Sequence, residues 1–226
     1  MLIAAIDTST IAVSVALADT DGLVARFDAP RVRRHAETVL AALDAILTLA
    51  GRTRREMTHV CVDVGPGMFT GLRVGVTTAI TLAMALDVPV VSVGSLDVLA
   101  WRVALGGAHG GVVGTVLDAR RGECFVQPFM VTPGEAPVSL APPAAMTPGS
   151  AAEFLVQHGC SVVIGDGPAA YPDQFARFRV LAPQYPDAAT AAIVALRTIE
   201  TATPADEVVL RYLREPDAEI PRDLRP

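Results

Sequence analysis

The sequence predicts a mixed α/β fold of two lobes, each a sheet flanked by helices. Short apolar runs bounded by turn residues alternate with segments of 3.6-residue periodicity, which is the order expected of sheets covered by helices. A strand, a polar turn and a return strand occur twice, about 110 residues apart, which indicates a divergent duplication. The 226 residues, 51% of them hydrophobic, are enough for two cores of about 100 residues each.

The chain begins with three meandering strands. Residues 2–6 and 11–17 form a predicted hairpin that turns at residues 7–10, where the apolar run gives way to Asp and hydroxyl side chains. Residues 23–27 add a third strand after an Asp-Gly turn.

Helix-linked strands follow this meander. Residues 35–50 carry apolar side chains at helical spacing, and Gly51 fits the C-cap. After a buried strand at 60–64, Thr70 is expected to cap a helix that runs to about Leu86. This order predicts a mixed sheet with helices packed on its faces.

A glycine-rich segment at residues 106–111 marks the expected lobe boundary, after a strand at 89–93 and a helix at 95–103. We therefore expect an N-terminal lobe of residues 1–105 and a smaller C-terminal lobe of residues 106–226. The second lobe repeats the hairpin with strands at 112–117 and 123–129, and adds a helix near 150–158, a strand at 161–164, a helix at 187–200 and a mobile tail from residue 215.

Composition excludes several classes of protein. The net charge is -6 and all 18 basic residues are Arg, so a strong phosphate-binding stripe is not expected and any RNA should be held by something else. The start of the chain does not have the pattern of a signal peptide, and the longest apolar run, residues 74–86, is shorter than a membrane span. We expect a cytoplasmic protein that does not enter membranes, with its three cysteines in the core.

An Asp follows the first strand of each hairpin, at Asp7 and Asp118. Two such carboxylates on facing lobes suit a clamp around a Mg-bound nucleotide, with Thr8 and Ser9 in the first turn. Asp and Ser are also ordinary turn residues, so an ordinary structural role stays open for these positions.

The stretch GPGMFTGLRVG, residues 65–75, is the most informative in the chain. Its glycines permit a strand exit with positive φ, and Gly71 and Gly75 lie on one helix face, where a second backbone could come close. The helix that follows is apolar nearly all round, so both of its faces should be covered. The second cover is either a partner helix or another part of the same monomer.

This stretch closely resembles the GPGSFTGLRxG signature of the TsaB (YeaZ) family. Four further segments resemble family landmarks in the same order, Met68 replaces the usual Ser, and Cys124-Phe125 stand where Val-Tyr is common. The four segments are Ile6-Asp7-Thr8-Ser9, His35-Ala36-Glu37, Asp118-Ala119-Arg120-Arg121-Gly122-Glu123 and Tyr212-Leu213-Arg214.

The resemblance implies a duplicated actin-like ATPase fold (ASKHA, ribonuclease H-like) and a non-catalytic paralogue of TsaD. The implied function is that of a scaffold and activating subunit in the complex that forms N6-threonylcarbamoyladenosine at position 37 of tRNAs reading codons that start with A. The implied partners are TsaD in a heterodimer and TsaE, with tRNA reached only indirectly and a homodimer when the protein is isolated. No cofactor of its own is expected, although ATP or ADP and Mg fit at the level of the complex.

The first and second helices of the N-terminal lobe are the implied contact with TsaD. Both carry wider apolar stripes than one sheet contact requires, which suits the largely apolar interface of an obligate complex. The residues expected at this interface are Val39, Leu43, Ile46, Gly71, Leu72, Gly75, Ala79, Leu82 and Ala83.

Two enzymatic alternatives remain at this stage. One is a small actin-like kinase or ATPase that uses Asp7, Thr8, Ser9 and Asp118 with Mg-ATP. The other is a metallopeptidase, against which the four histidines count, because no two are spaced to place a pair of imidazoles around a metal.

Overall fold

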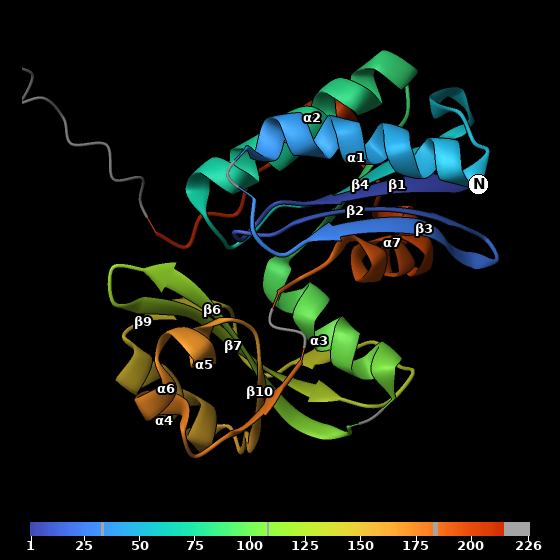
Figure 1. Ribbon diagram of the computed structural model, residues 1–226. Helices are drawn as coiled ribbons and strands as arrows, with labels where there is room; N and C mark the ends of the chain where they lie inside the picture. Colours follow the sequence, from blue (N-terminus) through green and yellow to red (C-terminus); the bar gives the residue numbers. More distant parts are fainter. Residues whose placement is uncertain (33, 108, 183–184, 215–226) are drawn as a thin grey trace, which may run out of the picture.

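The computed structural model describes residues 1–32, 34–107, 109–182 and 185–214. Within these ranges the chain forms two sheets that lie one above the other in Figure 1, each with helices on both faces. The expectation of a mobile tail concerns residues outside this description.

The first sheet has the strand order β3-β2-β1-β4-β5. β1 pairs antiparallel with β2 and parallel with β4, so the sheet is mixed, as the sequence predicts. Its strands are β1 (Leu2–Asp7), β2 (Val13–Asp19), β3 (Gly22–Ala29), β4 (His59–Asp63) and β5 (Val90–Val93).

Helices α1 (His35–Ala50) and α2 (Phe69–Leu86) cover one face of this sheet. Gly51 ends α1 in the left-handed conformation, as expected of a C-cap. The expected cap of α2 is wrong, because the helix begins at Phe69 and Thr70 lies inside its first turn. A short 3-10 turn, η1 (Arg54–Glu56), joins α1 to β4.

The second sheet has the order β11-β10-β6-β7-β8, with β9 paired to β7. β6 pairs antiparallel with β7 and parallel with β10, so β7-β6-β10 repeats the arrangement β2-β1-β4 and the predicted duplication is confirmed. The strands are β6 (Gly111–Arg120), β7 (Glu123–Val131), β8 (Val138–Ser139), β9 (Ala144–Met146), β10 (Val162–Ile164) and β11 (Arg179–Leu181).

Helix α3 packs on one face of the second sheet, and three helices pack on the other, as Figure 1 shows. These helices are α3 (Ser95–Gly106), α4 (Pro148–Gln157), α5 (Gly167–Ala170) and α6 (Pro172–Phe175).

Helix α7 (Ala188–Arg197) departs from the expected division of the chain. It belongs to the second half of the sequence, yet it packs on the face of the first sheet opposite α1 and α2 (Figure 1). Buried alanines along the helix let it lie close to β1 and β2. The first lobe is therefore completed by residues beyond 105, followed by two 3-10 turns, η2 (Ile199–Thr201) and η3 (Ala205–Glu207).

Helix α2 is a core helix of this fold. Its 18 residues have a mean hydropathy of 1.5, so by length and composition alone it could cross a membrane. Its inner side, with Val76, Ala79 and Ala83, instead packs in the same core as the first sheet and α1. A buried helix of a soluble domain passes the same length and composition test.

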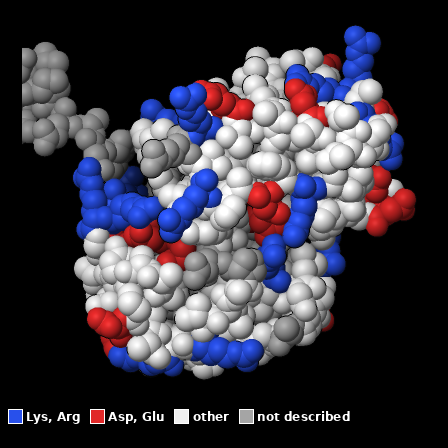
Figure 2. All heavy atoms as spheres, in the orientation of Figure 1, with Lys and Arg blue, Asp and Glu red and all other residues white. Residues whose placement is uncertain are grey.

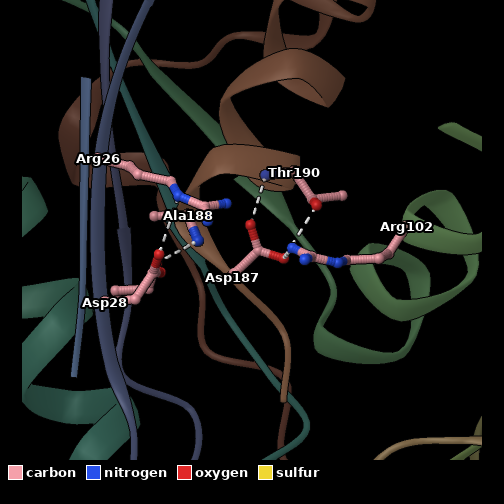
Figure 3. Close-up of polar contacts among 7 residues, drawn as sticks. Arg26, Asp28, Arg102, Asp187, Ala188 and Thr190 are labelled. Carbon is pink, nitrogen blue, oxygen red and sulfur yellow. Dashed lines mark hydrogen bonds and ion pairs between the residues drawn. The ribbon is translucent and has the colours of Figure 1, made fainter. Parts of the chain in front are cut away.

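A polar cluster around Asp187 joins α7 to its neighbours (Figure 3). The carboxylate of Asp187 caps α7 by accepting hydrogen bonds from the Thr190 amide and hydroxyl, and it pairs with Arg102 on α3. The Ala188 amide donates to the Ser14 hydroxyl on β2. One helix end thus fixes α3 relative to the first sheet.

We expect Asp187→Ala to lower the free energy of unfolding by about 2 kcal/mol, since it removes a helix cap and one side of a mostly buried ion pair. Urea denaturation at neutral pH measures the loss. Asp187→Asn retains an oxygen for the Thr190 amide and should lose less. An unchanged stability of Asp187→Ala would contradict the joining role of this cluster.

Candidate functional site

Three segments that are far apart in sequence meet in a cleft between the lobes. They are the start of α2, the β6–β7 turn and the chain after η3, the same segments that carry the family resemblance. The cavity that they enclose has a volume of about 780 Å³. It is lined by Pro66, Gly67, Met68, Phe69, Thr70, Arg73, Asp118, Ala119, Arg120, Arg121, Phe125, Arg211, Tyr212, Leu213 and Arg214.

The cleft is basic although the chain as a whole is acidic. Five arginines line it and Asp118 is its only carboxylate among the residues that the structure describes. Figure 2 shows basic side chains gathered at the left of the molecule, where the two lobes meet. Arg73 lies over the ring of Phe69, 3.8 Å from its centre, and donates to the Tyr212 hydroxyl at 3.3 Å. Asp118 pairs with Arg120 at 3.0 Å.

The first hairpin turn, where the sequence placed a nucleotide site, is covered by the start of α2. The Thr8 hydroxyl donates to the Gly71 carbonyl at 2.8 Å, and the Met68 amide donates to the Ser9 carbonyl at 2.7 Å. A Cβ on Gly71 would lie 2.2 Å from the Thr8 carbonyl oxygen. The glycines therefore allow a second backbone to approach, as expected, but that backbone is the protein's own β1–β2 turn.

This arrangement does not form the expected nucleotide clamp. Asp7, Thr8 and Ser9 are almost fully buried, and their polar groups bond to each other or to the backbone of α2. Of the four residues proposed for nucleotide binding, Asp118 alone lines the cleft. A phosphate could reach the first turn only if the start of α2 moved away.

Asp63, at the end of β4, lies beside Asp7, and sequence reasoning missed this neighbour. The two buried carboxyl groups hydrogen-bond to each other. The other oxygen of Asp63 accepts from the Gly65 amide and the Ser95 hydroxyl, at 2.7 Å each. Burial, and then the charge of Asp7, raise the pKa of Asp63 well above its ordinary value. The pair therefore shares one proton.

The second lobe repeats this pair at the ends of β6 and β10. Asp166 accepts from the Asp118 amide at 2.8 Å, and Tyr171 donates to the Asp118 carboxylate at 3.2 Å. Burial raises the pKa of Asp166 to about 6. Carboxyl ends of adjacent parallel strands meet at one sheet edge, so the Asp that follows each second strand was a readable signal.

Within the described ranges, the structure brings no three His, Cys, Asp or Glu side chains together in a way that could hold a metal ion. The three cysteines are buried among apolar residues, as the sequence predicts. Burial raises the pKa of Cys124 to about 12, which keeps this thiol protonated.

The partner surface expected from the sequence is wrong. All nine residues proposed for it are buried within the monomer, and Leu82 is the most exposed of them at 8%. Most pack on the first sheet, whereas Gly71 and Gly75 contact Thr8. The periodicity that identified these helices marks the side facing their own sheet. The nine are Val39, Leu43, Ile46, Gly71, Leu72, Gly75, Ala79, Leu82 and Ala83.

The outward sides of α1 and α2 form another surface, which we call the outer face. Leu49 is 84% exposed and Met84 is 67% exposed, and residues 74–86 include no charged side chain. A groove of about 430 Å³ lies between Ala36 on α1 and the first turns of α2. The outer face is centred on Leu40, Leu49, Phe69, Thr77, Thr81 and Met84.

Comparison with known families gives a consistent result. The family model of TsaD, tRNA N6-adenosine threonylcarbamoyltransferase, matches residues 28–154, more than half of the chain. The tRNA threonylcarbamoyladenosine biosynthesis protein TsaB of Bacillus subtilis is 35% identical over 125 residues, which cover 55% of this chain and 53% of that protein. TsaB of Escherichia coli is 35% identical over 130 residues, with the same coverage. The matched part thus spans about half the length of these curated relatives.

Solved structures agree over a longer range. YeaZ from Pseudomonas aeruginosa superposes with a TM-score of 0.78 and 26% identity, over 94% of this chain and 99% of that one. The activator of 2-hydroxyisocaproyl-CoA dehydratase from Clostridium difficile, solved with bound ADPNP, shares the fold with a TM-score of 0.51 and 10% identity, covering 88% of this chain and 96% of that one. The predicted duplicated actin-like ATPase fold is confirmed.

Proposed function

The chain belongs to the TsaB (YeaZ) family, and on this premise we propose that it serves the biosynthesis of threonylcarbamoyladenosine in tRNA as a non-catalytic binding subunit. Its partner in this proposal is a TsaD-type protein, which supplies the transferase chemistry, and TsaE joins the pair. The RNA is reached through the complex. Closure of the first hairpin turn supports a role without catalysis, because it covers the residues that would hold a nucleotide.

The observation that carries the proposal is the outer face of α1 and α2. Uncharged side chains such as Thr77, Thr81 and Met84 are presented on neighbouring turns of α2, and Leu40 and Leu49 project from α1. Depletion of charge and exposure of large apolar side chains are typical of the centre of a stable interface. A pair of helices from a TsaD-type partner fits this surface.

Co-purification with the cognate TsaD-type protein tests the proposal. Met84→Arg and Thr81→Arg should each weaken the association at least about 30-fold, since a central charge would be buried without a counter-ion. Leu140→Arg adds the same charge at an exposed site of the second lobe and should bind like the wild type. Unimpaired association of both α2 variants would contradict the proposed face.

We expect the isolated protein to form a homodimer through the same face, because an exposed apolar surface without its partner tends to self-associate. Analytical ultracentrifugation of wild type and Met84→Arg distinguishes this from a dimer formed elsewhere. Under the proposal the variant sediments as a monomer. A dimer that persists in the variant would separate self-association from the partner face.

A further inference from the structure

The basic cleft between the lobes is a site that the proposed partner contact does not use. It opens away from the outer face, on the side where the β6–β7 turn and the chain after η3 meet the start of α2. Arg73, the nearest cleft residue to the outer face, makes no ion pair with any carboxylate in the part of the chain that the structure describes. Its guanidinium is held instead by the Phe69 ring and the Tyr212 hydroxyl.

The charge of the cleft calls for an anion. Arg120 lies at the tip of the β6–β7 turn, and Arg211 follows a backbone hydrogen bond from its amide to the Val64 carbonyl, so both are carried by ordered segments. Their positive charges are opposed by a single lining carboxylate, Asp118, whose side chain is 8% exposed. Concentrating arginines in this way costs electrostatic repulsion, which a ligand with several negative charges would offset.

Aromatic side chains make the rest of the wall. Phe69 and Tyr212 form a tilted pair with ring centres 5.3 Å apart, and Phe125 lies deeper, on β7. Rings beside arginines are the usual means of holding a base together with its phosphates. A volume of about 780 Å³ suits one small molecule, and it does not form the long groove that would follow a strand of RNA.

We propose that this cleft binds a nucleoside polyphosphate, with the phosphates at Arg73, Arg120 and Arg211 and the base against the aromatic wall. The site differs from the covered first hairpin turn, where Asp7, Thr8 and Ser9 were expected to act. Arginine recognition of phosphate needs no metal ligand from the protein. The inference does not depend on the identity of the protein partner.

Isothermal titration calorimetry of the full chain with ADP tests this site, with pyrophosphate and adenosine as partial ligands. ADP should bind in a saturable way, pyrophosphate more weakly, and adenosine least. The double variant Arg120→Gln/Arg211→Gln should lose at least about 10-fold in ADP affinity. Arg177→Gln, which removes an exposed arginine from another part of the second lobe, should bind ADP like the wild type.

Three results would overturn the assignment. They are the absence of saturable ADP binding at millimolar concentration, unchanged affinity of the double variant, and tighter binding of a single-stranded RNA octamer than of ADP. The last would assign the cleft to RNA. Thermal melting shows that the double variant is folded, and its co-purification with the TsaD-type protein should be normal. Failure of ADP binding therefore leaves the partner proposal intact, and failure of the partner proposal leaves ADP binding intact.

Discussion

Gly71→Ala is expected to lower the free energy of unfolding by about 2 kcal/mol, although alanine is the better helix former. In an open helical site the exchange would gain about 1 kcal/mol. At Gly71 the added Cβ would lie 2.2 Å from the Thr8 carbonyl oxygen, which belongs to backbone on a buried turn and cannot turn aside. Overpacking of this kind costs about 3 kcal/mol, so the clash outweighs the gain.

Gly149→Ala is the matched control, because Gly149 lies in α4 and nothing lies within 4 Å of its would-be Cβ. This variant should be slightly more stable than the wild type. Urea denaturation of both proteins compares the two helical glycines directly. If Gly71→Ala proved as stable as Gly149→Ala, the start of α2 would not lie against the first hairpin turn, and that turn would be open to a ligand.

The sequence predicted the local elements and the duplication well, for a physical reason. Helical and strand periodicities are set by neighbouring residues, so α1 has the predicted bounds and both hairpins are present. The short strands β8 and β9 were missed because their sequence is proline-rich, which weakens any periodic signal. The position of α7 was missed because it depends on contacts between residues almost the whole chain apart.

The candidate site shows a sharper limit. Periodicity tells which side of α2 is apolar, but not whether its own sheet or a partner covers that side. Val76 and Ala79 face the sheet, so the surface left for a partner consists of residues that contribute less to the periodic pattern, such as Thr77 and Thr81. The same limit applies to Asp63, which reads as the end of a buried strand until the parallel pairing of β4 with β1 brings it to Asp7.

Asp63→Asn is expected to stabilise the protein increasingly as the pH rises. The unfolded carboxyl has an ordinary pKa of 3.8, whereas burial and the charge of Asp7 raise the folded pKa. Below about pH 4 both states hold the proton, so Asp63 imposes no penalty. Above it only the folded state keeps the proton, and the free energy of unfolding falls by up to about 1.4 kcal/mol per pH unit until the folded pKa is reached.

An asparagine would reproduce the protonated form without this dependence. Its oxygen can accept from the Gly65 amide and the Ser95 hydroxyl, and its amide can donate to Asp7. We expect equal stability near pH 4 and a gain of about 2 kcal/mol near pH 7, measured by denaturation across that range. Asp63→Ala separates charge from hydrogen bonding, because it leaves all three partners unpaired and should be less stable at pH 4. Parallel pH profiles of wild type and Asp63→Asn would show that the two carboxyl groups do not share a proton.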